Sequence, residues 1–297
     1  MKNEIVSSLK TWYYNKLNRN LDITNPKTFN EKMQWLKIYN ATQIKTELAD
    51  KYKVRDWIKQ KIGEQYLIPL LGVYDKFEDI NFNELPNQFV IKCNHGSGYN
   101  IIVTDKSKLN IIEVKNKINR WMSEDFSLRC GFELHYSKIK PRIIIEKYIN
   151  PIESNHEIQV WCFNKTIKFV SVESNKTLDH LFRGTFYPNE QPTEFEISPN
   201  HYNKLNIIPD KKAFHKAIEL AKKLQVDVPF VRIDFIELNG DVKFREMTFT
   251  SGSGLSKIEP ENYNLILGNW ITLPELAYDH ENNTYYRLKS KKKNKYF

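Results

Sequence analysis

The stretch from Phe230 to Leu255 constrains this chain more than any other part of the sequence. Hydrophobic and polar residues alternate on both sides of Asn239-Gly240, and an Asn-Gly pair in that context is a strong signal for a β-hairpin. Asp234 lies in the first predicted strand and Glu246 in the second. Two such carboxylates can hold Mg²⁺, which usually takes one or two protein carboxylates together with substrate phosphates. Considered alone, the hairpin is more typical of a sheet edge with solvated charges.

The length of the turn decides whether the two carboxylates can meet, because side chains alternate between the faces of a strand. A two-residue loop at Asn239-Gly240 pairs Ile233 with Glu246 and puts the carboxylates on opposite faces. A three-residue loop, Leu238-Asn239-Gly240, pairs Arg232 with Glu246 and brings both carboxylates and Arg232 onto one face. We predict the longer loop, because a metal site requires a turn of odd length or a bulge.

Composition allows a large hydrophobic core and favours an anionic ligand. The 297 residues are enough for one large domain or two ordinary ones, and 40% of them are hydrophobic. The formal net charge is +9. Lys291–Lys293 predict a solvated basic tail, and the remaining excess suits nucleotides, uronic acids or nucleic acid. No regularly interleaved aromatic residues indicate a nucleic-acid-binding module, so we expect no nucleic-acid partner.

The sequence predicts a cytoplasmic protein. Cys93, Cys130 and Cys162 are widely spaced and odd in number, which fits neither a disulfide framework nor a zinc site. The first 20 residues lack the apolar centre of a signal peptide. No apolar run reaches the roughly 20 residues of a transmembrane segment. Peripheral contact of basic residues with the inner membrane face stays open.

The pattern of apolar residues predicts an α+β fold with largely antiparallel sheets. Residues 1–65 should be helical, and Thr28–Glu31 fits a capping box. Further helices are predicted over Thr46–Lys61, Ile111–Glu124 and Ala213–Leu224. Strands are predicted over Phe89–Lys92, Ile101–Val103, Arg142–Ile149, Glu157–Phe163 and Thr166–Val172. The last two should form a hairpin that turns at Asn164-Lys165.

Two segments before the hairpin carry residues that suit a nucleotide. Lys92 ends a predicted strand that runs into Gly96-Ser97-Gly98, where glycines let backbone N–H groups approach phosphate oxygens. The P-loop pattern is missing, and an ordinary tight hairpin is an equal alternative. The segment Glu146-Lys147-Tyr148-Ile149 can offer backbone groups to an adenine edge, and Glu157 can accept bonds from ribose hydroxyls. Its alternative is a strand with a solvent-facing Glu-Lys pair.

Three further features have both a functional and a plain structural interpretation. Lys51 and Arg55 lie four residues apart, so on one helix they would share a face and could reach phosphates or be solvated. The small-residue segment Thr248–Gly254 can cradle a phosphoryl group or be a flexible surface loop. His95 could contact phosphate, but we expect a structural role for it.

The order of these elements is more specific than any one of them, and it resembles the ATP-grasp superfamily. More narrowly, the chain is similar to the TupA-like ATP-grasp family, which is named for teichuronopeptide synthesis and is found in surface-polysaccharide gene clusters. The similarity spans roughly Pro26 to Pro274. Its motifs are Pro26–Trp35, Asp50–Arg55, Phe89–Gly98 and Glu246–Thr250.

The resemblance implies that two α+β subdomains clamp ATP. Lys51 and Lys92 would then contact the α- and β-phosphates, and Gly96-Ser97-Gly98 would close over them. The implied adenine and ribose contacts are Glu146, Lys147 and the backbone of Ile149 for adenine, and Glu157 for ribose. A third phosphate-contacting cation is expected, and both Lys168 and Arg183 are candidates for it.

The resemblance also assigns the hairpin. Asp234 and Glu246 would hold Mg²⁺, while Arg232 and Lys92 would act as the catalytic residues, with Arg232 stabilising the phosphoryl group in transfer. Many ATP-grasp proteins carry Asn two residues after the second acidic ligand, and this chain has Thr248 there. A hydroxyl can still bind Mg²⁺, so Thr248 joins the two carboxylates as an expected metal ligand.

By this resemblance we expect an ADP-forming ligase of polysaccharide biosynthesis, acting on capsule, O-antigen or cell-wall glycan. It would join a sugar carboxylate, such as a uronic acid, to an amino acid or small amine through an acyl phosphate. A glycosyltransferase is one alternative, although no clear DxD motif is present, and a non-catalytic nucleotide-binding module is another.

The expected organisation has three parts. A reduced helical region over residues 1–65 precedes an ATP-grasp core over 66–280, and a basic tail covers 281–297. Within the core, a smaller lid-like subdomain would span about 90–150 and a larger metal-binding subdomain about 151–280.

Overall fold

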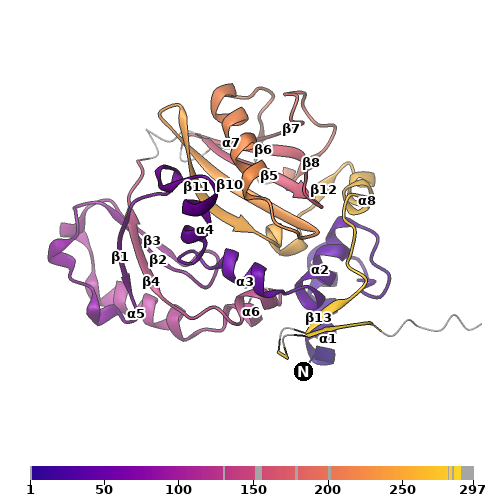
Figure 1. The fold of residues 1–297 in the computed structure, drawn as a ribbon, viewed down its shortest axis with the longest axis horizontal. Helices are drawn as coiled ribbons and strands as arrows, with labels where there is room; N and C mark the ends of the chain where they lie inside the picture. Colours follow the sequence, from indigo (N-terminus) through magenta and orange to yellow (C-terminus); the bar gives the residue numbers. More distant parts are fainter. Residues whose placement is uncertain are drawn as a thin grey trace, which may run out of the picture.

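The computed structural model describes residues 2–129, 131–150, 156–177, 180–199, 202–279, 281–282 and 284–288. Two β-sheets lie beside each other, and helices cover their outer faces (Figure 1). The predicted α+β fold with largely antiparallel sheets is therefore confirmed. Cys130 and the lysines of the predicted basic tail, Lys291–Lys293, lie outside the described residues. None of the described helices is both long and apolar enough to cross a membrane.

The first sheet has four antiparallel strands in the order β1-β4-β2-β3. Their bounds are Leu70–Tyr74 for β1, Phe89–Cys93 for β2, Asn100–Val103 for β3 and Ile143–Lys147 for β4. Helix α5, Ile111–Ser123, packs Val114, Ile118 and Trp121 against this sheet. Strand β1 belongs to this sheet although it precedes residue 90, where the smaller subdomain was expected to start.

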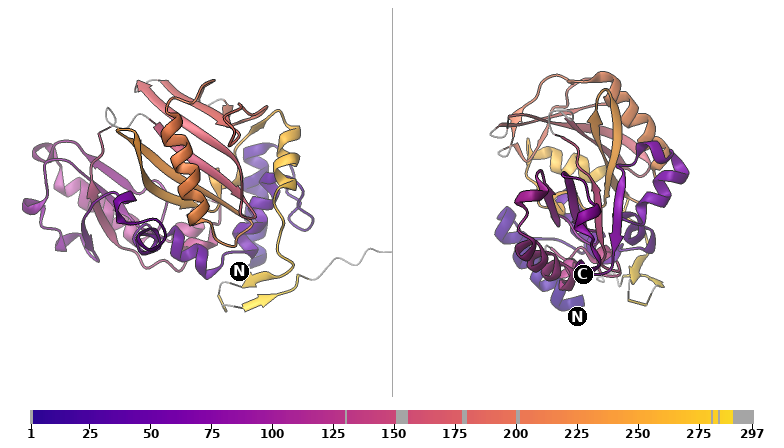
Figure 2. Two further views of the ribbon diagram at one scale, coloured as in Figure 1. Left: turned by 45° about the horizontal axis from the view of Figure 1, so that its top comes forward. Right: turned by 90° about the vertical axis from the view of Figure 1, so that its left-hand side faces the viewer.

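The second sheet has six strands in the order β11-β10-β5-β6-β7-β9, and only β7 and β9 run parallel. The bounds are His156–Phe163 for β5, Thr166–Thr177 for β6, His180–Phe186 for β7, Asn203–Lys204 for β9, Phe230–Leu238 for β10 and Asp241–Thr248 for β11. Helix α7, Lys211–Leu224, covers one face with its apolar stripe (Figure 2). Asp210 caps this helix by accepting a hydrogen bond from the N–H of Ala213 at 2.9 Å.

The opposite face of the second sheet is covered by α1 (Lys2–Leu17), α2 (Phe29–Tyr39) and α8 (Asn262–Asn269). Phe29, at the start of α2, packs against the rings of Trp161, Phe163 and Phe230. The predicted capping box at Thr28 and Glu31 is present and begins this helix. The N-terminal region is thus tied to the core by aromatic packing.

The helix predicted over Thr46–Lys61 is in fact two short helices, so that prediction was wrong. The four N-terminal helices are α1 (Lys2–Leu17), α2 (Phe29–Tyr39), α3 (Gln43–Ala49) and α4 (Val54–Lys61). The helical path is interrupted at Asp50, whose Oδ1 accepts hydrogen bonds from the N–H groups of Tyr52 and Lys53. This local bonding competes with helix continuation. Lys51 therefore lies in the turn and does not share a helix face with Arg55.

The remaining elements are short. They are η1 (Glu64–Tyr66), η2 (Phe77–Asp79), η3 (Phe82–Glu84), η4 (Lys106–Lys108), α6 (Phe126–Arg129), η5 (Leu134–Tyr136), β8 (Glu196–Ile197), η7 (Ser251–Gly254), β12 (Ile258–Glu259), β13 (Ala277–Asp279) and β14 (Thr284–Tyr286). Strand β8 pairs with β12, and β13 pairs with β14.

The hairpin of β10 and β11 turns through two residues, so the prediction of a three-residue loop was wrong. Leu238 pairs with Asp241, which leaves only Asn239-Gly240 in the loop. Both loop residues have positive φ, 53° and 79°, as the favoured two-residue hairpin turn requires. The tight turn suits the strand twist better than the longer loop.

A β-bulge, the other arrangement that the metal site allowed, occurs in the middle of the hairpin. The register shifts after Asp234, which pairs directly with Glu246, while the next pair is Phe235 with Phe244. Arg245 is the extra residue on β11. The bulge brings both carboxylates onto one face despite the even turn. Arg232 pairs with Thr248 instead of Glu246.

Candidate functional site

A narrow cavity of about 280 Å³ lies between the two sheets, and we call it the narrow cavity. Residues of the first sheet and of β5, β6, β10 and β11 line it. Every predicted adenine and ribose residue is among them, namely Glu146, Lys147, Ile149 and Glu157, together with Lys92. Ile68, Val90, Ile102 and Ile236 give the cavity an apolar part. A flat aromatic base suits such a mixed pocket.

Glu146 anchors the first-sheet wall of the narrow cavity. Its carboxylate accepts a hydrogen bond from Lys92 Nζ at 2.6 Å and from Arg55 Nη1 at 3.1 Å. Arg55 also donates to the carbonyl of Ile68 at 2.9 Å. Because Glu146 is only 6% exposed, both cations are needed to offset the cost of burying its charge.

Carboxylates on β5 and β6 form the opposite wall and are also paired. Glu157 forms an ion pair with Arg245, the extra residue of the bulge, which also lines the narrow cavity. Gln159 Nε2 donates to Glu157 and to Glu173, at 3.1 Å each. Glu173 in turn binds Arg183. The sequence reasoning missed the part of Arg245, because only the bulge brings it to Glu157.

Asp234 is fully buried and held by Arg232. The guanidinium donates from Nε to Oδ1 at 2.8 Å and from Nη2 to Oδ2 at 2.5 Å. Arg232 Nη1 also donates to Ser251 Oγ at 2.8 Å, which fixes the arginine in place. Burial raises the pKa of Asp234, and the arginine opposes this rise.

Glu246 is the more open carboxylate of the pair, with a side chain that is 33% exposed. It accepts a hydrogen bond from Thr248 Oγ1 at 3.2 Å and lies 3.7 Å from Lys51 Nζ and 3.8 Å from Arg232 Nη2. Burial works to raise the pKa of Glu246, but Lys51 and Arg232 outweigh it and hold the pKa below its ordinary value. Glu246 therefore stays ionised and available to a cation.

The donor set fits Mg²⁺ that arrives with a polyphosphate. Within the described residues, no group of three or more His, Cys, Asp or Glu side chains could hold a metal ion. Asp234, Glu246 and Thr248 supply two carboxylates and a hydroxyl on one face. Mg²⁺ commonly takes this few protein ligands and completes its shell with phosphate oxygens and water.

Lys51 connects the acidic pair to the glycine loop. Its Nζ donates to the carbonyl of Gly96 at 2.7 Å, and its backbone N–H donates to the carbonyl of Asn94. Gly98 has a φ of 73° and open space where a Cβ would lie. His95 is buried, with Nε2 3.0 Å from the carbonyl of Trp121, an arrangement that supports a structural role.

A second hollow, which we call the basic cavity, has a volume of about 620 Å³. Arg232, Glu246 and Thr248 form one part of its lining. The other part comes from α5, α6 and the loops near them, with Lys117, Arg120, Arg129, Glu133 and Tyr136. Asn100 lines both the basic and the narrow cavity, so the two meet there.

The sequence reasoning did not find the cations of the basic cavity. Lys117 and Arg120 lie three residues apart in a helix that was predicted correctly, and this spacing puts them on one face. That face was a usable signal. Arg129 comes from another helix, and only the tertiary structure brings it to the same cavity.

Glu133, which lines the basic cavity, and Lys37 are both buried, and each influences the charge of the other. Burial raises the pKa of Glu133 and lowers the pKa of Lys37. Thr250 donates a hydrogen bond to Glu133, and Lys37 Nζ donates to the carbonyl of Ser253 at 2.9 Å. These contacts fix the position of η7.

The two candidates for the third cation lie in different surroundings. Arg183 binds Glu173, which lines the narrow cavity. Lys168 Nζ lies 5.5 Å from the centroid of the Trp270 ring, among residues of the opposite face. This placement favours Arg183, and its role stays a proposal.

A family model described as TupA-like ATP-grasp matches residues 31–272. The chain belongs to the TupA-like ATP-grasp family. The match covers most of the chain and both sheets, so the family and the ATP-grasp fold that the sequence indicated are confirmed. No curated protein sequence shows a significant match to this chain.

Solved structures similar to this family member include several ligases. The D-alanine–D-alanine ligase of Bacillus anthracis in complex with ATP is 18% identical, with a TM-score of 0.41 over 68% of this chain and 55% of that one. The L-amino acid ligase of Bacillus licheniformis is 15% identical, with a TM-score of 0.45 over 70% of this chain and 44% of that one. This chain spans about half the length of these two ligases.

Proposed function

We propose that this protein is an ATP-dependent, ADP-forming carboxylate–amine ligase. The observation that carries the proposal is the direct pairing of Asp234 with Glu246 on one face, with Arg232 bonded to the first and 3.8 Å from the second. This acidic pair lies beside the basic cavity, which meets the narrow cavity at Asn100. A nucleotide in the narrow cavity would therefore direct its phosphates toward the carboxylates.

In this proposal the narrow cavity binds the nucleoside. Adenine would bind between the apolar residues and the backbone of Ile149, with Glu146 and Lys147 on its polar side. Glu157 would bind the ribose. Lys51 and Lys92 would contact the α- and β-phosphates, and the loop Gly96-Ser97-Gly98 would close over them.

Asp234, Glu246 and Thr248 would hold Mg²⁺, which on binding neutralises charge on the phosphates. Arg232 would stabilise the phosphoryl group during transfer, and its bonds to Asp234 and Ser251 keep it oriented in advance. Such preorganisation avoids a rearrangement at the moment of reaction.

The acid substrate would bind in the basic cavity, and its carboxylate would be held by Arg120, Arg129 and Lys117. A carboxylate oxygen attacks the γ-phosphorus of ATP, ADP leaves, and an acyl phosphate forms. The amine then attacks the carbonyl carbon, phosphate leaves, and the nitrogen loses its proton to complete the amide. Holding both substrates in one closed site supplies most of the rate gain.

A sugar carboxylate is the proposed acid, such as a uronic acid of a surface polysaccharide or its precursor. The cations of the basic cavity support an anionic acceptor. Tyr99 and Trp121, stacked at 5.1 Å in the same cavity, offer the flat apolar surface that ligand pockets commonly use. An amino acid or small amine is the proposed partner, and the proposed location is the cytoplasm.

An ADP-release assay tests this function. The full chain is incubated with Mg²⁺-ATP, with glucuronic or galacturonic acid, and with a panel of amino acids and small amines. We expect ADP and phosphate to form only when both an acid and an amine are present. Release of UDP from a UDP-sugar without ATP use would instead favour a glycosyltransferase. ATP binding without any turnover would indicate a nucleotide-binding module.

A further inference from the structure

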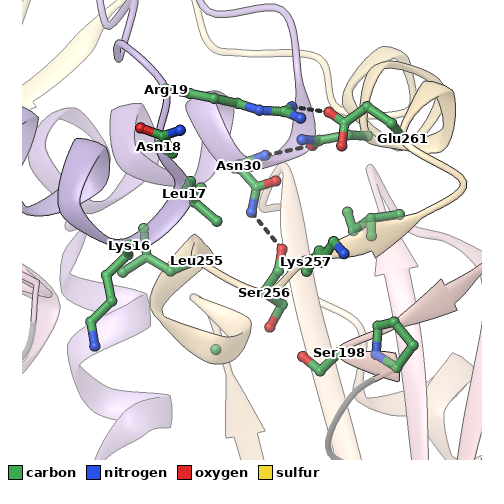
Figure 3. A pocket seen from close by; sticks show the side chains of 14 residues that line it. Lys16, Leu17, Asn18, Arg19, Asn30, Ser198, Leu255, Ser256, Lys257 and Glu261 are labelled. Atoms are coloured by element: carbon green, nitrogen blue, oxygen red, sulfur yellow. Dashed lines mark hydrogen bonds and ion pairs between the residues drawn. The ribbon is translucent and has the colours of Figure 1, made fainter.

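A third hollow, the outer cavity, lies on the far side of η7 and has a volume of about 590 Å³. The end of α1 forms one side of it, with Lys16 and Leu17, and Ser198 and Lys257 lie on the other side (Figure 3). None of the residues predicted to bind ATP or Mg²⁺ lines it. Part of its lining, including Lys16, precedes the segment that the family model matches.

The outer cavity adjoins the basic cavity at Gly252. This glycine is exposed, has a φ of 54° and lines both hollows. A Cβ at this position would collide with Oγ of Ser256. Because Gly252 has no side chain, the boundary between the two cavities stays open. The three cavities therefore follow one another, with Asn100 at the first boundary and Gly252 at the second.

The boundary between the two larger cavities is a rigid edge. Gln34 Nε2 donates to the carbonyl of Gly254 at 2.8 Å, and Asn30 Nδ2 donates to the same oxygen at 2.9 Å. Asn30 also donates to the carbonyl of Ser256 at 3.1 Å, a contact drawn in Figure 3. Both amide side chains are almost fully buried. These hydrogen bonds from buried side chains fix the backbone at the boundary, over which a ligand spanning both cavities would lie.

The charges of the outer cavity fit an anion. Lys16, Arg19 and Lys257 line it against a single carboxylate, Glu261. Arg19 already forms an ion pair with Glu261 (Figure 3). Lys16 forms no ion pair with the part of the chain that the structure describes, and Lys257 pairs with Glu259 outside the lining. An ammonium ligand would find its one carboxylate already neutralised, so the amine substrate does not fit here.

We propose that the outer cavity binds a second anionic group of the acceptor, next to the unit that reacts in the basic cavity. This inference rests on the proposed ligase function and deepens it, because it makes the acceptor larger than a single sugar. The second anion is either the neighbouring uronate of an acceptor chain or the diphosphate of a nucleotide sugar. Both present negative charge one unit away from the reacting carboxylate.

Titration calorimetry on the full chain tests the proposal with four probes: galacturonic acid, trigalacturonic acid, UDP-glucuronic acid and neutral maltotriose. The double variant Lys16→Glu/Lys257→Glu reverses two charges of the outer cavity. The matched control Lys10→Glu/Lys222→Glu reverses two exposed lysines, one on α1 and one on α7, that line none of the three cavities. Circular dichroism checks that both variants are folded.

We expect trigalacturonic or UDP-glucuronic acid to bind the wild-type chain about tenfold more tightly than galacturonic acid. The cavity variant should lose about tenfold in affinity for that larger probe and bind galacturonic acid unchanged. The control variant should bind all probes as the wild type does. The larger probe that shows the loss identifies the source of the second anion. Hydrogen exchange should slow over residues 16–19 and 255–261 with that probe alone.

Unchanged binding of both larger anions by the cavity variant would overturn the proposal. So would equal affinity of the wild-type chain for all anionic probes, or binding of maltotriose as tight as that of trigalacturonic acid. These measurements need neither ATP nor an amine. If no ADP forms but the cavity variant binds a larger anion more weakly, only the ligase function is refuted. If ADP forms but the cavity variant binds both larger anions unchanged, only the outer site is refuted.

Discussion

The narrow cavity and the basic cavity share a boundary at Asn100 but are built in different ways. The narrow cavity is made mostly of paired strands, and its carboxylates Glu146, Glu157 and Glu173 each have a bonded cation. Its polar groups are therefore neutralised and oriented before any ligand arrives, which suits a site for one fixed molecule such as a nucleoside.

Among the described residues, the basic cavity takes three of its four lining cations from helices and keeps an excess of positive charge. Arg120 and Arg129 both bind the single carboxylate of Glu124, at 2.9 and 3.1 Å. Lys117 makes no ion pair within the described ranges, and its Nζ lies 5.4 Å from the centroid of the Trp121 ring. This region suits an anionic substrate. The difference predicts that substitutions on the two sides separate nucleotide effects from acceptor effects.

The largest effect is expected at the acidic pair, Asp234 and Glu246, beside the basic cavity. Asp234→Asn and Glu246→Gln should each lower ADP formation by roughly a thousandfold, because the phosphates lose a metal ligand during transfer. Asp241→Asn, an exposed position on the same hairpin, should keep full activity. Thermal unfolding followed by circular dichroism checks the fold of all three. Near-normal activity of either site variant would rule out the proposed metal ligands.

Lys92→Met should act on the nucleotide side alone. It removes a proposed phosphate contact and one of the two cations on Glu146, so ATP affinity should fall about a hundredfold. The KM for the acid should not change. Lys108→Met, on an exposed side chain, is the control. A loss of acid binding equal to the loss of ATP binding would show that the two regions act as one site.

His135, next to Tyr136 in the wall of the basic cavity, should make the stability of the fold depend on pH. Burial, followed by Lys45 and Lys37, lowers its pKa from 6.5 to about 3. Below pH 6.5 the unfolded chain therefore takes up a proton that the folded chain does not, and stability falls toward acid by up to about 1.4 kcal/mol per pH unit. His135→Phe should remove about 2 kcal/mol of this loss between pH 6.5 and about 5, measured by urea unfolding. If the free energy of unfolding changed with pH equally in the wild type and the variant, His135 would not be the group whose pKa is lowered.

The smallest effect is expected for the exposed arginines of the basic cavity. Arg120→Ala and Arg129→Ala should each raise the KM for the acid about tenfold and leave the KM for ATP unchanged. Arg142→Ala serves as the matched control, because this cation directly precedes β4 and lines neither cavity. A change in the KM for ATP instead would place these arginines on the phosphates and erase the distinction between the two regions.

The sequence predicted the narrow cavity well because its residues belong to strands rich in β-branched and aromatic residues, a local signal. The strands that carry Lys92, Glu146 and Glu157 were all found, and these side chains do line one hollow. It predicted the basic cavity poorly, because that cavity joins Arg129 and Glu133 to hairpin residues such as Arg232 and Glu246, which lie far along the chain. Contacts over such distances leave no periodic signal in the chain.

Lys51 shows the same limit on a smaller scale. The motif Asp50–Arg55 was recognised, but the helix assigned to it was wrong, because helical spacing does not reveal that Asp50 bonds to the backbone after it. The resulting turn puts Lys51 at the carbonyl of Gly96 and 3.7 Å from Glu246. A continuous helix would instead have put Lys51 on the same face as Arg55.

By itself the sequence determined the elements of the acidic hairpin: two strands, the Asn239-Gly240 turn, and a carboxylate on each side. The tertiary structure alone decided how those carboxylates face one another. A shift of one residue in register moves every later side chain to the other face of a sheet. Phe244 and Met247 both pack into the core on one face of the hairpin, which requires the shift to fall between them, at Arg245. Asp234 and Glu246 therefore meet across a turn that by length alone would have separated them.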